Sequence, residues 1–359
     1  MAEPFKNMFN ADSIGVIAKA IKAEYKSFRP VEFLKSTMDE TWDSLELMAR
    51  ARKIATTLRE YLPADYREAV TIMEKSLTKQ PVAFFFPVFV EIYGQEEDDW
   101  DFSVSALGRT TEYWSAEFAV RPFIIKDCER MMAQMYAWSK DENENVRRLS
   151  SEGCRPQLPW GQALAEFKKD PAPILPILEQ LKADPSLFVR KSVANNINDI
   201  SKTHPDLIIS LAKKWQGKNK DTDWILKHGC RTLLKKGNRE ALALFGYDDV
   251  AAVDVTDFAL DKKTIAFGED ITFSFTISSK QAVKTRLEYG VDFVRANGKS
   301  NRKIFQISEI MLKENEKKAY SKKHSFAEIT TRKYYPGTHT ITLIVNGAEQ
   351  GQLSFELKE

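Results

Sequence analysis

Hydrophobic positions along the chain follow two different patterns, and the change falls near residue 250. Before it, apolar residues recur at helical spacing, as in LELMARARKIATTLREYL (residues 45–62) and DLIISLAKKW (206–215), with breaks at Pro, Gly and Asn. Residues three and four apart share one face of an α-helix, so this spacing predicts amphipathic helices. We therefore expect the first part of the chain to be helical throughout.

From Val253 onward, apolar residues alternate with polar ones in short runs that turn sequences separate. Alternation places every second side chain on one face of a β-strand, so each run predicts a strand with one buried face. About seven strands in roughly 105 residues predict an antiparallel sandwich of immunoglobulin-like type, without the disulfide and tryptophan of antibody domains. The runs are Ile271, Phe273, Phe275, Ile277; Leu287, Tyr289, Val291, Phe293; Ile341, Leu343, Val345; and Leu353, Phe355, Leu357, and the turns are FGED, RANGKSN, YYPGTH and VNGAEQG.

Three segments of the helical part repeat one pattern. They are DENENVRRLSSEG from Asp141, DPSLFVRKSVANN from Asp184 and DTDWILKHGCRTL from Asp221, at offsets of 43 and 37 residues. Each copy opens with an Asp that is expected to cap a helix, then has an apolar anchor and basic residues. A period of roughly 40 residues is typical of HEAT-like helix pairs that stack into a solenoid.

Chain length and pattern together predict the domain organisation. At 359 residues the chain is too long for one ordinary core, and the pattern changes within GYDDVAAVDV, residues 246–255. We predict a multidomain α + β protein, with an all-α HEAT-like repeat solenoid over residues 1–250 followed by an immunoglobulin-like antiparallel β-sandwich over residues 251–359.

The repeats are expected to line a concave groove with equivalent side chains. Glu152, Asn195 and Thr232 occupy one row in the three copies, and basic residues occupy the next. A groove striped with Arg and Lys suits a phosphate backbone, and a carboxylate there opposes phosphate binding. Glu152 therefore needs another role, and the alternative is that it only neutralises Arg148 or Arg155 through helix-spaced ion pairs.

Composition excludes several classes of protein. Charged residues make up 29% of the chain and hydrophobic residues 43%, and the net charge is only +2, so a polyanion partner must be argued from local clustering. No basic start with an apolar core and no run of about 20 apolar residues occurs, which favours a cytoplasmic protein without membrane contact. The cysteines Cys128, Cys154 and Cys230 are widely spaced, which favours reduced thiols and no metal site. Gly-rich phosphate loops, metal-ligand clusters and Ser-His-Asp arrangements are absent as well.

Three segments resemble a known family. SAEFAVRPFI (115–124), ENVRRLSSEGCRPQLPW (144–160) and FVRKSVANNINDISKTHPDL (188–207) are similar to the AlkC family of bacterial DNA alkylation repair glycosylases, relatives of the AlkD family. The resemblance covers most of the helical part, and its motifs are long and in the family's order. Some family members carry a C-terminal immunoglobulin-like domain, as the strand pattern here indicates.

The resemblance implies a monofunctional DNA glycosylase that acts on duplex DNA. The family hydrolyses the N-glycosidic bond of bases methylated at ring nitrogens, such as N3-methyladenine and N3-methylcytosine, without a deep base pocket. A cationic methylated base departs without a general acid, so the enzyme has to stabilise positive charge on the deoxyribose and to position a water, which carboxylates can do. It implies no cofactor, no metal and no lyase step. We expect a monomer in the cytoplasm, on the nucleoid when bound to DNA.

The resemblance also assigns roles to individual residues. Glu152 is expected to stabilise the sugar cation, Glu117 to assist it, and Trp160 to lie against the deoxyribose. Asn195 stands where AlkD relatives have a Trp, so an aromatic cage of the AlkD kind is not expected. The residues expected to bind DNA are Arg121, Arg147, Arg148, Arg155, Arg190, Lys191, Asn195 and Lys227 in the helical part, and Arg295, Lys299, Arg302 and Lys303 in the sandwich.

The sandwich residues in that set belong to a local excess of positive charge. Between Val294 and Lys333 there are eleven Lys or Arg against four Glu, a balance of +7. Asn297 and Gly298 predict a tight turn that projects the basic residues of RANGKSNRK from a strand pair. We expect this hairpin to grip the duplex so that the two domains encircle DNA. The alternative is a solubilising edge, since lysines commonly protect exposed strands.

Other readings of the candidate site stay open from the sequence. Glu117 precedes Arg121 by four residues, which also fits a plain helix ion pair, and Trp160 follows Pro159, which also fits packing at a helix start. A HEAT scaffold without catalysis explains the repeats and the basic stripe but not two Glu and a Trp beside it. A second alternative is an enzyme that hydrolyses sugar polymers with a pair of carboxylates, but such an enzyme does not need the rows of arginines.

Overall fold

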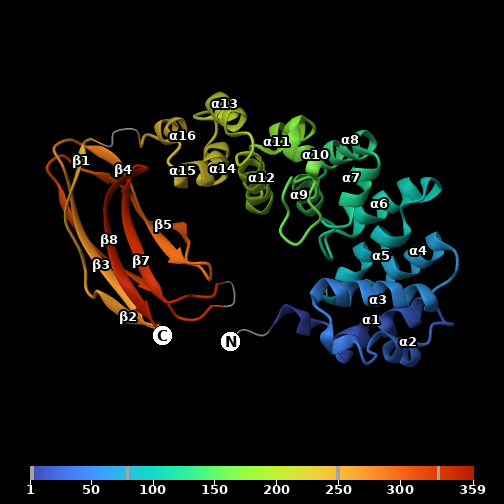
Figure 1. Cartoon of the computed structure of the whole chain (residues 1–359). Coiled ribbons are helices and arrows are strands. Elements are labelled where there is room, and N and C mark those ends of the chain that lie inside the picture. The colour runs from blue at the N-terminus through green and yellow to red at the C-terminus, as the bar shows by residue number, and fades with distance from the viewer. Residues whose placement is uncertain (1–3, 78–80, 248–250, 330–331) are drawn as a thin grey trace. The chain divides into compact units, whose positions relative to one another are not determined.

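The computed structural model of the protein describes residues 4–77, 81–247, 251–329 and 332–359. In this part of the chain sixteen α-helices precede eight β-strands, which confirms the predicted fold class (Figure 1). Short 3₁₀ turns join some helices. The helices are α1 (Ala11–Glu24), α2 (Pro30–Thr37), α3 (Leu47–Tyr61), α4 (Tyr66–Ser76), α5 (Phe85–Tyr93), α6 (Trp100–Thr110), α7 (Val120–Lys126), α8 (Cys128–Trp138), α9 (Glu144–Glu152), α10 (Ala165–Lys169), α11 (Leu175–Leu181), α12 (Leu187–Ile200), α13 (Pro205–Trp215), α14 (Lys220–Gly229), α15 (Arg231–Lys235) and α16 (Arg239–Leu244). The strands are β1 (Val253–Leu260), β2 (Thr264–Ala266), β3 (Asp270–Ser279), β4 (Val283–Val294), β5 (Ser300–Leu312), β6 (Lys317–Ser325), β7 (Gly337–Val345) and β8 (Ala348–Lys358).

The chain forms two compact units. The helical unit comprises residues 1–204 and 215–229, and the C-terminal unit comprises residues 205–214 and 230–359. The secondary structure changes within the predicted stretch 246–255, because α16 ends at Leu244 and β1 begins at Val253. Residues 230–247 nevertheless pack with the strands: the Lys284 ammonium donates to the carbonyl of Phe245 (2.8 Å), and Gly347 lies against Leu242. A domain boundary at residue 250 stays a prediction.

Capping side chains and apolar faces explain why these segments form helices. Asn10 begins α1 because its side-chain oxygen accepts from the Ser13 N–H (2.9 Å) while the Ser13 hydroxyl accepts from the Asn10 N–H. The Asp65 carboxylate begins α4 by accepting from the Glu68 N–H (2.7 Å). The apolar residues of α3, which the periodicity of residues 45–62 singles out, form its buried face.

The three sequence repeats form the first turns of α9, α12 and α14, which lie side by side in that order (Figure 1). The prediction that the opening Asp of each repeat is the helix cap is wrong in detail. The N-caps of α9 and α12 are Asn143 and Ser186, and Asp141 and Asp184 lie two residues earlier, where they accept from the N–H groups of those caps. Asp221 lies inside α14.

The arginine six residues after the opening Asp ties neighbouring repeats together. Arg147 donates to the carbonyls of Asp141 and Glu142 in its own repeat, and its Nε lies 2.7 Å from the Asp184 carboxylate of the next repeat. Arg190 repeats the arrangement: it donates to the carbonyls at 184 and 185, and its Nη2 lies 3.6 Å from Asp221 Oδ1. Arg147 and Arg190, which were predicted to bind DNA, thus direct their guanidinium groups at the turn carbonyls and at the carboxylate of the next repeat.

The predicted row of Glu152, Asn195 and Thr232 holds for only two repeats. Glu152 ends α9 and Asn195 lies in α12, but α14 ends at Gly229. Thr232 lies on α15, in the C-terminal unit. The third repeat is shorter, so its last predicted position falls outside the helix that carries the pattern.

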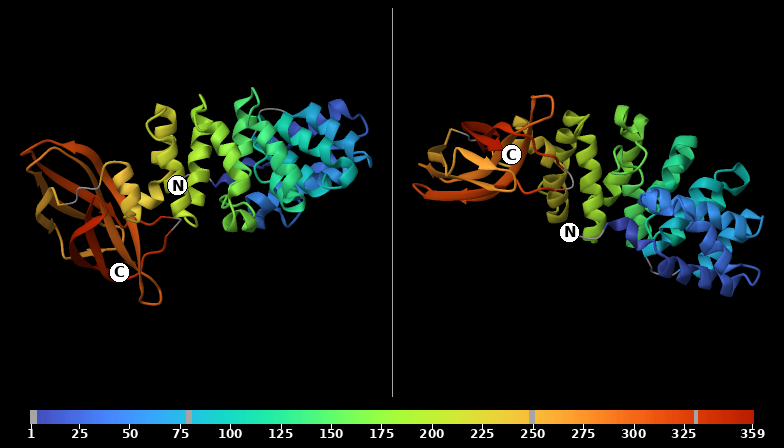
Figure 2. Two further views of the ribbon diagram at one scale, coloured as in Figure 1. Left: turned by 90° about the horizontal axis from the view of Figure 1, so that it is seen from above. Right: turned by 60° about the horizontal axis from the view of Figure 1, so that its bottom comes forward.

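The strands of the C-terminal unit form two sheets that pack face to face around one apolar core (Figure 2). Their orders are β1-β3-β6 and β2-β8-β7-β4-β5. The alternating residues of β3, β4 and β7 are buried in that core, as the pattern predicts. The sequence missed the three-residue β2, which runs parallel to β8, whereas the other strand pairs are antiparallel. The turn at RANGKSN joins β4 to β5 with Gly298 at φ +75°, where a residue without Cβ is favoured.

A histidine lies in this core. His324 of β6 is 8% exposed, and its Nδ1 lies 3.0 Å from the Tyr289 hydroxyl, while aromatic rings surround the imidazole. Burial, with a smaller contribution from Arg332, lowers the pKa of His324 from 6.5 to about 4. The folded unit therefore holds this imidazole neutral.

We expect acid to destabilise the C-terminal unit through His324. Between pH 6.5 and pH 4 the unfolded chain binds a proton at this histidine that the folded chain does not, so stability is complete above 6.5 and falls as the pH drops. From pH 7 to pH 5 the loss is about 2 kcal/mol. Hydrogen exchange of the β3 and β6 amides, corrected for intrinsic rates, measures it. His324→Gln should remove most of this loss and the matched variant His204→Gln should keep it; equal losses in all three proteins would contradict the assignment.

Candidate active site

The three predicted catalytic residues lie in the helical unit but on different segments. Glu117 lies in the turn that precedes α7, Glu152 is the last residue of α9, and Trp160 lies in the loop between α9 and α10. Local structure explains the position of each residue. Glu117 precedes α7 because the N-cap of that helix is Ala119, and Glu152 is the last residue of α9 because Gly153 ends the helix. Trp160 lies in a loop because the prolines at 156 and 159 keep that segment out of a helix.

One guanidinium group joins the two glutamates. Arg148 Nη1 donates to Glu117 Oε2 (2.6 Å) and to the Ser115 hydroxyl (2.8 Å), and its Nη2 lies 3.8 Å from Glu152 Oε1. The guanidinium also lies over the ring of Phe188, 4.7 Å from its centroid. Arg148 therefore brings together two acidic side chains that are 35 positions apart in the sequence. Sequence reasoning missed Ser115 and Phe188.

A second guanidinium fixes Glu152 from the other side. Arg155 Nη1 lies 2.5 Å from Glu152 Oε1, and Arg155 Nε donates to Asp199 Oδ2 (2.8 Å). Asp199 in turn binds the Lys202 ammonium (2.8 Å). Burial acts to lower the pKa of Arg155, but the carboxylates of Glu152 and Asp199 outweigh it and raise the pKa above its ordinary value. Arg155, which was predicted to bind a phosphate, is buried here between two carboxylates.

The result is a chain of alternating charges from Glu117 through Arg148, Glu152, Arg155 and Asp199 to Lys202. The ion pair of Glu152 with Arg148 and Arg155, left open by the sequence, is present. Both contacts reach Oε1, and within the described residues no hydrogen bond is recorded for Oε2. The carboxylate is thus held at one oxygen, which fixes its direction. The sequence also left open a helical ion pair between Glu117 and Arg121. That alternative is wrong, because Glu117 lies in a turn and its carboxylate binds Arg148.

Asp199 escaped sequence analysis because its main partner is distant in the chain. Its spacing to Lys202 is an ordinary helical pair, which indicates nothing beyond a solvated face. The contact to Arg155 spans 44 residues, and only the packing of α12 against α9 creates it.

Trp160 is exposed and its backbone is unusual. The side chain is 76% exposed, and φ is +63°, a left-handed conformation that costs free energy for a residue with a side chain. The predicted alternative, packing at a helix start, is wrong, since α10 begins only at Ala165. The loop is held by hydrogen bonds from Gly161 N–H to the Leu158 carbonyl (3.1 Å) and from Leu164 N–H to the Pro156 carbonyl (3.3 Å). An exposed, backbone-fixed aromatic side chain is suited to contact a ligand.

Arg121 was predicted to bind DNA, but its side chain lies inside the helical unit. The side chain is fully buried, and it donates to the carbonyls of Gly153 (2.8 Å) and Gln162 (2.5 Å). Burial lowers the pKa of Arg121 to about 10. A guanidinium without solvent contact cannot reach a phosphate.

The remaining predicted DNA-binding residues lie nearer to solvent. Lys191 is exposed, and Asn195 and Lys227 are half-buried; the buried amide in this region is Asn196, which donates to the Ser151 carbonyl (2.9 Å). Arg302 differs from its hairpin neighbours, because it binds Asp292 (2.8 Å) and Glu349 (2.5 Å). Arg295, Lys299 and Lys303 are exposed, and no ion pair is recorded for them in the described part of the chain.

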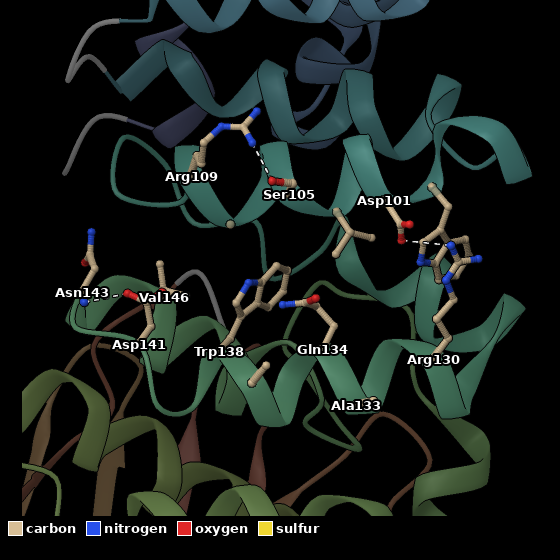
Figure 3. A pocket seen from close by; sticks show the side chains of 14 residues that line it. Asp101, Ser105, Arg109, Arg130, Ala133, Gln134, Trp138, Asp141, Asn143 and Val146 are labelled. Carbon is tan, nitrogen blue, oxygen red and sulfur yellow. Dashed lines mark hydrogen bonds and ion pairs between the residues drawn. The ribbon is translucent and has the colours of Figure 1, made fainter.

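The candidate residues do not line the larger hollow of the helical unit. A cavity of about 720 Å³ lies between α6 and α8, with Trp100 and Trp138 in its wall (Figure 3). Its two arginines, Arg109 and Arg130, bind carboxylates of Glu74 and Asp101, respectively. A smaller hollow of about 240 Å³ adjoins the candidate site and includes Ser115, Arg148 and Phe188. Neither glutamate lines either hollow: Glu152 is buried, at 5% exposure, and Glu117 is half-buried.

Among the described residues, no group of three or more His, Cys, Asp or Glu side chains could hold a metal ion. In the same residues, no helix is both long and apolar enough to cross a membrane.

Comparisons with known proteins identify the family. The model of the DNA alkylation repair enzyme family matches residues 10–233, and that of the C-terminal Ig-like domain of protein YhaZ matches residues 254–359. The chain belongs to the AlkC family of DNA alkylation repair enzymes. It is 38% identical to the structure of Pseudomonas fluorescens alkylpurine DNA glycosylase AlkC bound to DNA containing an abasic site analog, with a TM-score of 0.95 and coverage of 99% of this chain and 100% of that one. It is also 45% identical to YhaZ of Bacillus subtilis (strain 168) over 354 residues, 98% of this chain and 99% of YhaZ.

In this AlkC-family chain, we expect Asp199→Asn to destabilise the helical unit. The change leaves Arg155 buried with one carboxylate fewer, and breaking a buried ion pair from one side costs about 3 kcal/mol. Urea unfolding followed by tryptophan fluorescence measures the loss. Asp101→Asn is the matched control, because its pair with Arg130 is exposed and contributes less than about 1 kcal/mol. A loss for Asp199→Asn no larger than that of the control would show that the buried chain of charges does not stabilise the fold.

Proposed function

We propose that the protein is a monofunctional DNA glycosylase that hydrolyses the N-glycosidic bond of cationic alkylated bases, N3-methyladenine and N3-methylcytosine, in duplex DNA. One observation carries the proposal: Glu117 and Glu152 meet at the Arg148 guanidinium in an AlkC-family chain. Membership of a repair family supports DNA as the partner. The Pseudomonas relative, which was captured on DNA containing an abasic site analog, supports the same partner here.

The proposed chemistry needs carboxylates and little else. A base methylated at a ring nitrogen is already cationic, so the C1′–N bond breaks with its electron pair going to the base, which leaves neutral. Positive charge then develops on the deoxyribose, and nearby carboxylates stabilise it. Water adds its oxygen to C1′ and loses a proton, and the product is an abasic site. This sequence of events requires no metal, no cofactor and no lysine nucleophile.

The geometry of Glu152 suits the main role in this reaction. Arg148 and Arg155 hold Oε1, which leaves Oε2 to face the sugar cation and to orient the attacking water. Glu117, on the other side of Arg148, adds negative charge. The exposed indole of Trp160 is suited to lie against the deoxyribose, where its electron-rich face favours the cation.

We propose that DNA contacts come from fewer residues than the sequence indicated. The five arginines predicted to bind DNA in the helical part, Arg121, Arg147, Arg148, Arg155 and Arg190, make contacts within the protein, so Lys191, Asn195 and Lys227 remain there. In the C-terminal unit, the β4–β5 hairpin offers Arg295, Lys299 and Lys303 as exposed cations. We assign glycosylase chemistry to the domain of residues 1–250. We assign duplex binding to the β4–β5 hairpin within the domain of residues 251–359. A monomer in the cytoplasm remains our expectation.

We expect Glu152→Gln to retain DNA binding and to lose base release. Loss of the carboxylate charge should lower the single-turnover rate on methylated duplex DNA by about 10²-fold or more, which corresponds to about 3 kcal/mol of transition-state stabilisation. Base release and DNA affinity at two salt concentrations measure both properties.

Glu91→Gln is the matched control for that variant, since Glu91 is another helical carboxylate paired with an arginine, Arg52 (2.7 Å). It should release base at the wild-type rate. Normal release by Glu152→Gln would remove it from catalysis and point to Glu117. A wild type that binds DNA but releases no base would favour a scaffold without catalysis.

We expect Lys299→Glu combined with Lys303→Glu to weaken DNA binding and its salt dependence. If each lysine neutralises one phosphate, the slope of log K against log salt should fall by about 2. Fluorescence anisotropy of labelled duplex DNA over a salt series measures it. The control carries the same charge change at Lys313 and Lys317, two exposed lysines of the KENEKK segment (residues 313–318), outside the β4–β5 turn. An equal loss in both double variants would show that net charge matters and the hairpin does not.

A further inference from the structure

Arg121 is the largest fully buried side chain of the protein, and its placement is costly. Burial of a guanidinium removes it from water, and Arg121 has no ion pair with a carboxylate in the described part of the chain. Its Nη2 is buried without a hydrogen-bond partner. A methionine of similar length would fill this space without those costs. A role beyond filling space is therefore indicated for Arg121.

The two hydrogen bonds of Arg121 reach both segments that carry the candidate catalytic residues. Its Nη1 donates to the carbonyl of Gly153, which directly follows Glu152 at the end of α9. Its Nε donates to the carbonyl of Gln162, two residues after Trp160. Arg121 itself lies in α7, four residues after Glu117. One planar group thus joins the segments of all three residues.

The contacts around Gly153 leave its segment little freedom. A Cβ at Gly153 would lie 2.6 Å from Val120 and 3.0 Å from the Leu149 carbonyl, so α9 approaches α7 as closely as a glycine permits. The Arg121 hydrogen bond adds a fixed direction to that close contact, because a guanidinium donates only in its own plane. Glu152 is therefore fixed both by packing and by Arg121.

The Trp160 loop is tied to α7 by Arg121. Two backbone hydrogen bonds, from Gly161 N–H to the Leu158 carbonyl and from Leu164 N–H to the Pro156 carbonyl, lie within the loop segment itself, whereas the Arg121 bond to the Gln162 carbonyl comes from another helix. Trp160 has φ +63°, a conformation that persists only where surrounding contacts impose it. Without Arg121, the loop loses its tie to α7, and the exposed indole gains freedom to move.

We propose that Arg121 is a positioning residue that holds the Trp160 loop and the Glu152 end of α9 at a fixed separation. This proposal rests on the proposed glycosylase function. Arg121 touches neither DNA nor the reacting atoms in it. It sets where the indole and the carboxylate meet the deoxyribose, and a displacement of about 1 Å at such a site can cost 10²-fold in rate.

Arg121→Met and Arg121→Lys test the proposal against Arg50→Met. Arg50 is a matched control, because it is also buried and also donates to backbone carbonyls, those of Leu45, Lys6 and Phe9. It lies in α3, away from the site. Both Met variants should lose stability. Arg121→Met alone should lower the single-turnover rate at saturating enzyme by about tenfold or more, with DNA affinity changed less than about threefold, and Arg121→Lys should recover part of that rate.

The second readout does not depend on activity. The fluorescence anisotropy decay of Trp160 is obtained as the difference between each protein and its Trp160→Phe counterpart. We expect Arg121→Met to add a fast nanosecond component that the wild type and Arg50→Met lack. Should Arg121→Met fail to fold, Arg121→Lys carries both measurements.

The outcomes separate this inference from the proposed function. Equal rates for folded Arg121→Met and Arg50→Met, with an unchanged Trp160 decay, overturn the positioning role. If the wild type releases no base, the glycosylase proposal fails by itself, and the anisotropy decay alone decides whether Arg121 holds the loop.

Discussion

The helical unit depends on guanidinium groups that each bind two segments far apart in sequence. A guanidinium has five N–H donors in one plane, so it can bind carbonyls and carboxylates in fixed directions at the same time. Arg147 and Arg190 join repeat to repeat in this way, and Arg148 and Arg155 join the carboxylates of the candidate site. The positions of the acidic side chains follow from these joints.

Because these arginines are paired with carboxylates, the candidate site and the attraction to DNA depend on different residues. From Glu117 to Lys202, three carboxylates alternate with three cations, so the network carries no net charge. A neutral network neither attracts nor strongly repels a phosphate backbone at long range. In the proposed function, attraction to DNA comes from exposed cations elsewhere, and the glutamates are free to act on a local positive charge. A glutamate in a basic stretch, which looks unfavourable in the sequence, is thereby accommodated.

The sequence predicted what depends on local spacing. Helical periodicity, the alternation in β3, β4 and β7 and the Asn-Gly hairpin all act over a few residues, and the structure agrees with them. The contacts of the arginines within the protein could not be predicted, because a sequence shows a charge but not its partner. The contacts from Arg148 to Glu117, from Arg147 to Asp184 and from Arg155 to Asp199 span 31, 37 and 44 residues. The left-handed backbone of Trp160 gave no signal either, because that conformation is rare for any residue except glycine.

The joints between repeats also bear on how this protein can change. Arg147 needs the Asp that opens the next repeat, and Arg190 needs the one after it. In a repeat array, stability is the sum of repeats and of the interfaces between neighbours, and here each interface includes a charge that only the neighbour balances. Removal of the middle repeat would take away Asp184, the partner of Arg147, together with Arg190, the partner of Asp221. Both interfaces would lose their ion pair at once, whereas a lengthened loop outside these contacts would disturb neither. The contacts from α9 to α14 therefore tie the arginine of each repeat to the start of the next one.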